Sequence, residues 1–199
     1  MVGLMLMLSL MVGWGFAWPA SKIALEEIPP LLLRTVTLSL GGIGLLLLAR
    51  GLGLRLRIES TELKAFAVMT FFNVTGWQVC MAYGVYLMPA GRASIIGNTI
   101  PIWVALFGVW MLKEKVSRSI ALGILSGMAG MFVLIGSDFA LLSTAPLGAL
   151  FMVAAAVSGA IGAICVKLKQ WQTPLTVLAG WSLLLGGLPV YIATLAIGP

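Results

Sequence analysis

Seven apolar runs, each close to the length that crosses a lipid bilayer, dominate this sequence. A membrane-spanning helix needs about 20 predominantly apolar residues. The 199-residue chain is 61% hydrophobic and only 9% charged, whereas a soluble domain is about one quarter charged. The pattern predicts an all-α integral membrane protein embedded in the lipid bilayer. We expect its helices at residues 2–21, 31–49, 65–88, 93–112, 119–136, 147–166 and 175–197.

Basic residues gather in alternate connections between these runs, which predicts the orientation of the chain. The second, fourth and sixth connections contain Arg50, Arg55, Arg57, Lys64, Lys113, Lys115, Arg118, Lys167 and Lys169. Because cytoplasmic loops carry an excess of Lys and Arg, we expect the N-terminus in the cytoplasm and the protein in the cytoplasmic (inner) membrane. The net charge of +6 is thus explained by orientation, and we expect no nucleic-acid partner.

An internal repeat becomes visible when the chain is shifted by 145 residues. The pairs in register are Lys22 with Lys167, Pro29 with Pro174, and Gly41-Gly42 with Gly186-Gly187. Five spans separate the copies, so the second would be inverted in the membrane, an arrangement typical of transporters. Chance in a Gly- and Leu-rich chain is the alternative. We expect one five-helix repeat at 1–137 and two helices of a second at 145–199, hence a C-terminally truncated chain or a homodimer.

Polar and aromatic residues interrupt the apolar runs, mainly in spans three and four. Pro101 lacks an N–H and should open or kink its helix beside Asn98. We expect a substrate cavity for a small amphipathic solute, lined by Trp14, Trp18, Asn73, Trp77, Asn98 and Trp103. In the alternative, Asn73 and Asn98 only join helices through hydrogen bonds.

Three cations lie near the predicted outer boundary of the membrane. Lys22 is expected to extend its ammonium group toward the interface, while Arg34 and Arg92 could attract anionic groups or tie helices together. Small residues repeat at four-residue spacing in the fifth and sixth spans, as in Gly123 and Gly127 and in Ala155 and Gly159. This spacing predicts close helix packing.

The groups needed for intramembrane catalysis are missing from the sequence. There is no histidine, and every Asp or Glu lies in or beside a connection. Cys80 and Cys165 both lie inside apolar runs. We therefore expect no catalytic residues, no metal, no cofactor and no enzymatic activity.

Five motifs, in order, resemble the EamA-type transporters of the drug/metabolite transporter superfamily. They are Trp14–Lys22, Ile28–Leu32, Tyr83–Pro101, Leu112–Val116 (with Lys113 where glycine is usual) and Gly123–Gly130. The resemblance implies a ten-helix exporter of metabolites, including amino-acid-like solutes, or drugs, which works by alternating access between two inverted halves. The first-span glutamate of the small multidrug relatives is missing from this chain.

A non-transporting seven-helix scaffold or sensor is the competing interpretation. It accounts for seven spans without further helices, but it does not account for the inverted repeat.

Overall fold

The computed structural model describes residues 2–112, 117–136 and 145–197, and every regular element in these ranges is a helix. Asp138 and residues 113–116 of the fourth motif lie outside them. Six helical segments are long and apolar enough to cross a membrane, and α7 (Arg118–Gly136) provides a seventh apolar helix. The predicted all-α membrane fold of about seven helices is confirmed.

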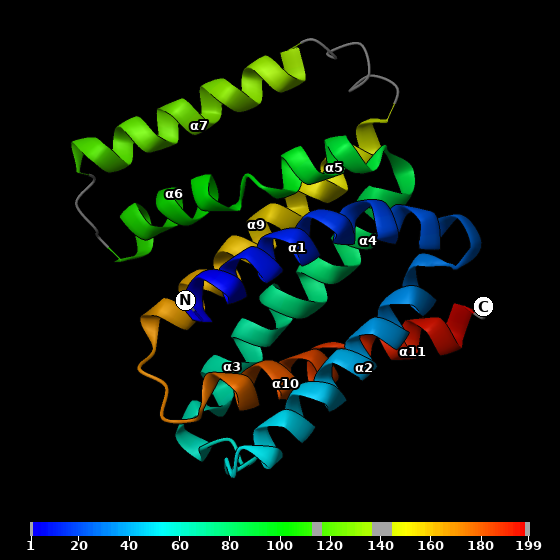
Figure 1. Ribbon diagram of the computed structural model, residues 1–199, viewed down its shortest axis with the longest axis vertical. Coiled ribbons are helices and arrows are strands. Elements are labelled where there is room, and N and C mark those ends of the chain that lie inside the picture. Colours follow the sequence, from blue (N-terminus) through cyan, green and yellow to red (C-terminus); the bar gives the residue numbers. More distant parts are fainter. Residues whose placement is uncertain (1, 113–116, 137–144, 198–199) are drawn as a thin grey trace.

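The first span is α1 (Val2–Glu27), and the second is α2 (Pro30–Gly51). The third span consists of η1 (Ser60–Glu62), α3 (Leu63–Thr70), η2 (Phe71–Gly76) and α4 (Trp77–Leu87). The fourth is divided into α5 (Ala90–Gly97) and α6 (Ile100–Leu112). After α7 come α9 (Pro146–Leu168), α10 (Leu175–Gly186) and α11 (Leu188–Ile197). Figure 1 shows their arrangement.

The third span contains one π-helical segment, η2 (Phe71–Gly76), which the sequence pattern did not predict. A π-helix widens the turn and leaves carbonyls available to other donors. Here the Ser158 hydroxyl of α9 donates to the Phe72 carbonyl at 2.8 Å, and Thr75 donates to the Gly186 carbonyl at 2.6 Å. Hydrogen bonds from side chains thus hold η2 against α9 and the end of α10.

Helix α9 is the central element and runs antiparallel to the third span (Figure 1). Glycines make the close crossing possible: Gly84 faces Met152, Gly159 faces the Trp77 ring, and Gly162 lies against the Asn73 backbone. The expected close packing of small residues is confirmed for span six. Gly123 and Gly127 of α7, by contrast, have open space beside them.

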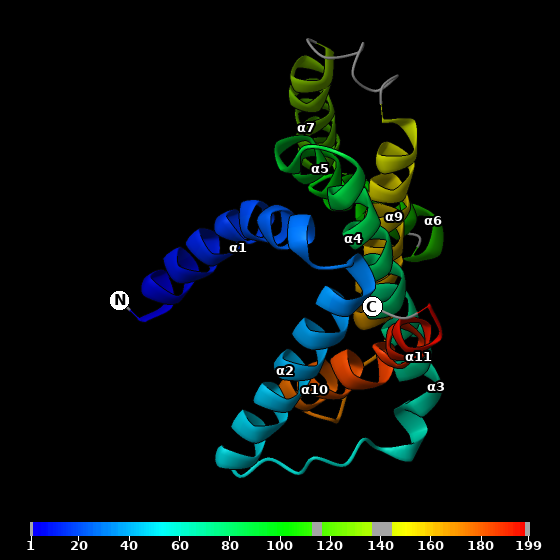
Figure 2. The same cartoon turned by 90° about the vertical axis from the view of Figure 1, so that its right-hand side faces the viewer.

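A second antiparallel pair joins α2 to α10 and α11. Gly42 of α2 approaches Gly180 and Leu184 of α10, and Thr35 shares a 3.0 Å hydrogen bond with Thr194 of α11. Figure 2 shows these helices below the α4–α9 pair, with α1 extending away from the rest of the bundle. Among the six segments long enough to cross a membrane, α1 is the least buried.

The two ends of the third span are fixed by different contacts. At its start the Glu62 carboxylate is only 1% exposed and accepts bonds from the Gln172 amide at 2.6 Å and the Thr173 hydroxyl at 2.6 Å. At its end the Lys22 ammonium donates to the carbonyls of Val85 at 3.1 Å and Tyr86 at 2.9 Å. Lys22 and Glu62 therefore mark opposite ends of the third span.

Candidate solute site

Three neighbouring cavities lie along α1 and α5. The tryptophan cavity, about 420 Å³, is an open hollow bordered by α1, α2 and α4, and its lining includes Trp14, Trp18 and Trp77. The α1–α5 cavity, about 450 Å³, shares Trp14 and Trp18 with it and adds Asn98. The α5–α7 cavity, about 690 Å³, contains Asn98 and Pro101. Shared lining residues place the three side by side, in the size range of small-molecule sites.

The tryptophan cavity combines apolar walls with four polar side chains, those of Ser9, Ser21, Arg34 and Gln78. Trp14 and Trp18 come from α1 and Trp77 from the start of α4. Arg34 of α2 and Gln78 of α4 line the same space. Among the cavity's lining residues, all of them within the described ranges, Arg34 alone carries a formal charge.

The side chains of Arg34 and Gln78 are both incompletely paired. Arg34 is only 6% exposed, and its recorded partner is the Met81 sulfur, 3.7 Å from Nη2, a weak acceptor. Its Nε atom is buried without a hydrogen-bond partner, as is the Oε1 atom of Gln78. One orphaned donor and one orphaned acceptor thus belong to two side chains that line the same cavity.

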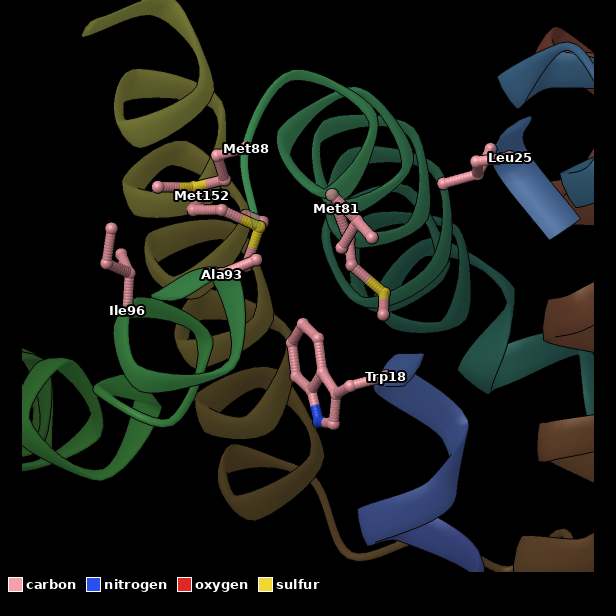
Figure 3. Close-up of a cluster of buried hydrophobic side chains, with 9 residues drawn as sticks. Trp18, Leu25, Met81, Met88, Ala93, Ile96 and Met152 are labelled. Atoms are coloured by element: carbon pink, nitrogen blue, oxygen red, sulfur yellow. The ribbon is translucent and has the colours of Figure 1, made fainter. Parts of the chain in front are cut away.

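Trp18 forms the boundary between this cavity and the hydrophobic core. Figure 3 shows its indole reaching from α1 into the space between α4 and α5, beside Met81, Ala93 and Met152. Gly97 leaves room for the ring, since a Cβ on this glycine would lie 2.6 Å from Trp18 Cη2. Trp14, by contrast, is 55% exposed. The two indoles on α1 therefore differ in burial although both line the cavity.

The fourth span is interrupted just before Pro101. Helix α5 ends at Gly97, α6 begins at Ile100, and Pro101 lies in the first turn of α6, where its missing N–H is tolerated. The Asn98 side chain, at the interruption, donates from Nδ2 to the Ser94 carbonyl at 2.8 Å. Asn98 and Pro101 both line the α5–α7 cavity.

Two of the residues expected in the cavity lie elsewhere. Asn73 lines none of the three cavities, and its backbone packs against Gly162 of α9. Trp103 also lines none of them; its Nε1 donates to Thr99 Oγ1 at 3.1 Å, and its ring lies 6.3 Å from that of Phe107. The structure therefore places Trp14, Trp18 and Trp77 together, brings Asn98 to the adjoining space, and separates Asn73 and Trp103.

The three predicted cations occupy different environments. Lys22 binds the last carbonyls of α4, where a cation also favours the negative end of the helix dipole. Arg34 lines the tryptophan cavity. Arg92 lies in the first turn of α5 and is partly buried. Lys22 therefore ties α1 to α4 rather than only extending to the interface.

Sequence reasoning overlooked Gln78 and Glu62. Gln78 follows Trp77 directly, and an amide within an apolar span was the available signal. Glu62 was assigned to a connection, and nothing in its local sequence indicates that the 172–173 segment covers it. Both positions depend on contacts between distant spans.

Groups suited to binding, rather than to bond chemistry, surround these cavities. The lining consists of indoles, one guanidinium, amides, hydroxyls and apolar side chains. Across the described ranges, no group of three His, Cys, Asp or Glu residues could hold a metal ion. The arrangement can hold a flat apolar solute and offer it a cation.

Comparison with known proteins places the chain among membrane transporters. Residues 1–136 match the EamA-like transporter family. The chain is 27% identical to the uncharacterised transporter YoaV of Bacillus subtilis over 194 residues, which is 96% of this chain and 66% of that relative. It is also 27% identical to a probable amino-acid metabolite efflux pump of Salmonella typhimurium, over 96% of this chain and 62% of the pump.

A shorter match joins the chain to an aromatic amino acid exporter, YddG, of Ancylobacter novellus. The two are 28% identical over 112 residues, which is 55% of this chain and 38% of the exporter. The chain thus spans less than two thirds of the length of these relatives. No solved structure matches it.

Proposed function

Because this chain belongs to the EamA-like transporter family, we propose that it exports small amphipathic metabolites, amino-acid-like solutes above all, or drugs across the cytoplasmic membrane. Transport proceeds by alternating access, in which the solute cavity opens to one side of the membrane at a time. The N-terminus lies in the cytoplasm, as the distribution of basic residues predicts.

The observation that carries this proposal is the tryptophan cavity. Three indoles from two spans border about 420 Å³ of space, and aromatic side chains provide large apolar contact with defined geometry. A few polar groups among apolar walls are typical of small-molecule sites. The names of two relatives, an amino-acid metabolite efflux pump and an aromatic amino acid exporter, support export as the direction.

Packing between α2 and α10 supports the inverted-repeat mechanism. These are the second helices of the two proposed repeats, 1–137 and 145–199, and they run antiparallel with Gly42 close to Gly180. Inverted repeats place the substrate site near their interface. We propose that further helices, from a longer chain or from a second copy in a homodimer, complete the second repeat.

Substitution of Trp14 tests the function in cells that express the gene encoding this chain. Trp14→Ala removes one wall of the cavity while leaving the protein core intact, because this residue is largely exposed. We expect efflux of preloaded radiolabelled phenylalanine to fall by about fivefold to tenfold, from lost aromatic contact and apolar area. Trp110→Ala is the matched control, since Trp110 lies near the end of α6 and is 80% exposed.

Two outcomes would contradict the proposal. Equal efflux from cells with and without the protein, despite its presence in the membrane, would favour the scaffold or sensor interpretation. Equal loss in the Trp14 and Trp110 variants would show that the tryptophan cavity has no special part in transport.

A further inference from the structure

We infer that Arg34 and Gln78 recognise the two charged groups of a zwitterionic α-amino acid, with the Arg34 guanidinium on the carboxylate and Gln78 Oε1 accepting from the ammonium group. The inference rests on the proposed transport function and adds the residues that would select its substrate. The tryptophan cavity then accommodates the solute's apolar, preferably aromatic, side chain.

The state of Arg34 is the first argument. A guanidinium that is 94% buried, as its 6% exposure implies, loses most of its hydration, and a cation inside a span is costly unless it is paired. Yet its recorded bond goes to a methionine sulfur, and Nε has none. The five donors of a guanidinium match the two oxygens of a carboxylate. A carboxylate entering the cavity would supply the acceptors that the protein does not.

Gln78 adds the second half of the argument. Its buried Oε1 requires a hydrogen-bond donor, which a carboxylate cannot provide but an ammonium group can. Orphaned buried polar atoms are uncommon in folded proteins and call for an explanation. One orphaned donor and one orphaned acceptor, on two side chains that line the same cavity, are complementary to a ligand that carries both an anion and a cation.

The indoles restrict the remaining part of the solute. Trp14, Trp18 and Trp77 line the cavity together with Arg34 and Gln78, so the charged groups of the ligand lie close to flat apolar surfaces. Stacking of aromatic rings adds to the free energy of apolar burial. An aromatic α-amino acid satisfies both parts of this site, whereas a purely hydrophobic drug leaves the two orphaned atoms unpaired.

Four solutes separate these contributions when bound to the purified chain in phosphatidylcholine nanodiscs, with tryptophan fluorescence as the readout. Phenylalanine carries both charged groups, 3-phenylpropionate only the carboxylate, phenethylamine only the ammonium, and toluene neither. Since a hydrogen bond to a charged group is worth about 1.5–3 kcal/mol, we expect phenylalanine to bind about tenfold or more tightly than either singly charged analogue.

Substitutions assign each preference to its residue. Arg34→Gln should reduce phenylalanine affinity to that of phenethylamine, and it should not weaken phenethylamine binding, because the like charge of the guanidinium is removed. Gln78→Leu should reduce phenylalanine affinity to that of 3-phenylpropionate and leave 3-phenylpropionate unchanged. Arg50→Gln removes the same charge from the exposed end of α2, and this control should leave all four affinities as they are.

Several results would overturn the inference. An unchanged ratio of phenylalanine to phenethylamine affinity in a monodisperse Arg34→Gln protein would do so. Where that variant does not yield monodisperse protein, Gln78→Leu decides, and an unchanged ratio of phenylalanine to 3-phenylpropionate affinity overturns it. Phosphatidylethanolamine also carries an anion and an ammonium group. If this lipid binds in an Arg34-dependent manner and phenylalanine does not bind, the site is a lipid site.

Failure of the inference can be told apart from failure of the transport proposal. Phenylalanine binding with the expected charge preference, but no efflux from cells, would refute transport and leave the site standing. Efflux of amphiphiles without any dependence on Arg34 or Gln78 would refute the site and leave transport standing.

Discussion

At the scale of single residues, the two asparagines that were both expected to line the solute cavity occupy different positions. Asn98 lies at the interruption between α5 and α6 and lines two of the three cavities. Asn73 lines none of the three, and its backbone and Cβ are the atoms closest to Gly162. The amide of Asn98 is thus available to a solute, while Asn73 belongs to the crossing with α9.

This difference gives a prediction for transport. Asn98→Ala should reduce the efflux of an amino acid several-fold, since one hydrogen bond contributes about 0.5–1.5 kcal/mol. Asn73→Ala keeps the Cβ that faces Gly162 and should leave efflux close to wild type. Both variants are compared at equal amounts in the membrane. Equal loss of efflux in the two would assign a common role to both asparagines and contradict this distinction.

At the scale of helices, the crossing between α9 and the third span depends on the absence of side chains on α9. A Cβ on Gly162 would lie 2.8 Å from Asn73 Cα and 2.9 Å from Asn73 N. These are backbone atoms, which cannot rotate away, so the two helices would have to separate. Contacts along the whole crossing, including the Ser158 bond to Phe72, would be affected.

Gly162→Ala should therefore destabilise the protein by about 1–3 kcal/mol, the usual cost of overpacking. Gly44→Ala in α2 is the matched control, because nothing lies within 4 Å of the added methyl group. In a helix interior this control should be neutral or stabilising by about 0.5–1 kcal/mol. Thermal unfolding of the purified variants measures both effects. Equal stability of Gly162→Ala and wild type would show that the crossing is looser than described.

The sequence predicted the helices far better than it predicted their contacts. Apolar runs specify spans because each one satisfies its backbone hydrogen bonds internally, and Pro101 indicated the interruption before α6. The π-helical turn at 71–76 was not predictable from its own residues, because the donor on its carbonyl, Ser158, comes from α9. The burial of Arg34 likewise depends on Met81, which lies 47 residues away in the sequence.

At the scale of the whole molecule, the contacts of Lys22 and Lys169 define two opposite faces. Lys22 reaches the end of the third span, and Lys169 donates to the Thr61 carbonyl at its start, 3.5 Å away. Thr61 and Tyr86 lie 25 residues apart in that span, so the two contacts are separated by roughly 37 Å along a helix axis. This is close to the thickness of a bilayer with its headgroups, roughly 40–45 Å.

Cysteine labelling tests the orientation that we propose for these faces. In a chain with Cys80 and Cys165 replaced by Ala, Glu27→Cys should react with an impermeant thiol reagent on intact cells. Lys169→Cys should react only after the cells are permeabilised, since the basic loops are expected in the cytoplasm. Labelling at position 169 on intact cells would reverse or refute the topology.

The contacts of α1 also have a consequence for the synthesis of the protein. Lys22 and its acceptor Val85 are 63 residues apart, and Met152, beside Trp18 in the core, comes later still. At about 5–20 residues per second, the ribosome needs roughly 3–13 s to add the residues between Lys22 and Val85. During this interval α1 lies in the membrane without its anchors. Helix α1 is thus inserted early and docked late, and errors in its assembly would arise after translation of α4 rather than at the start.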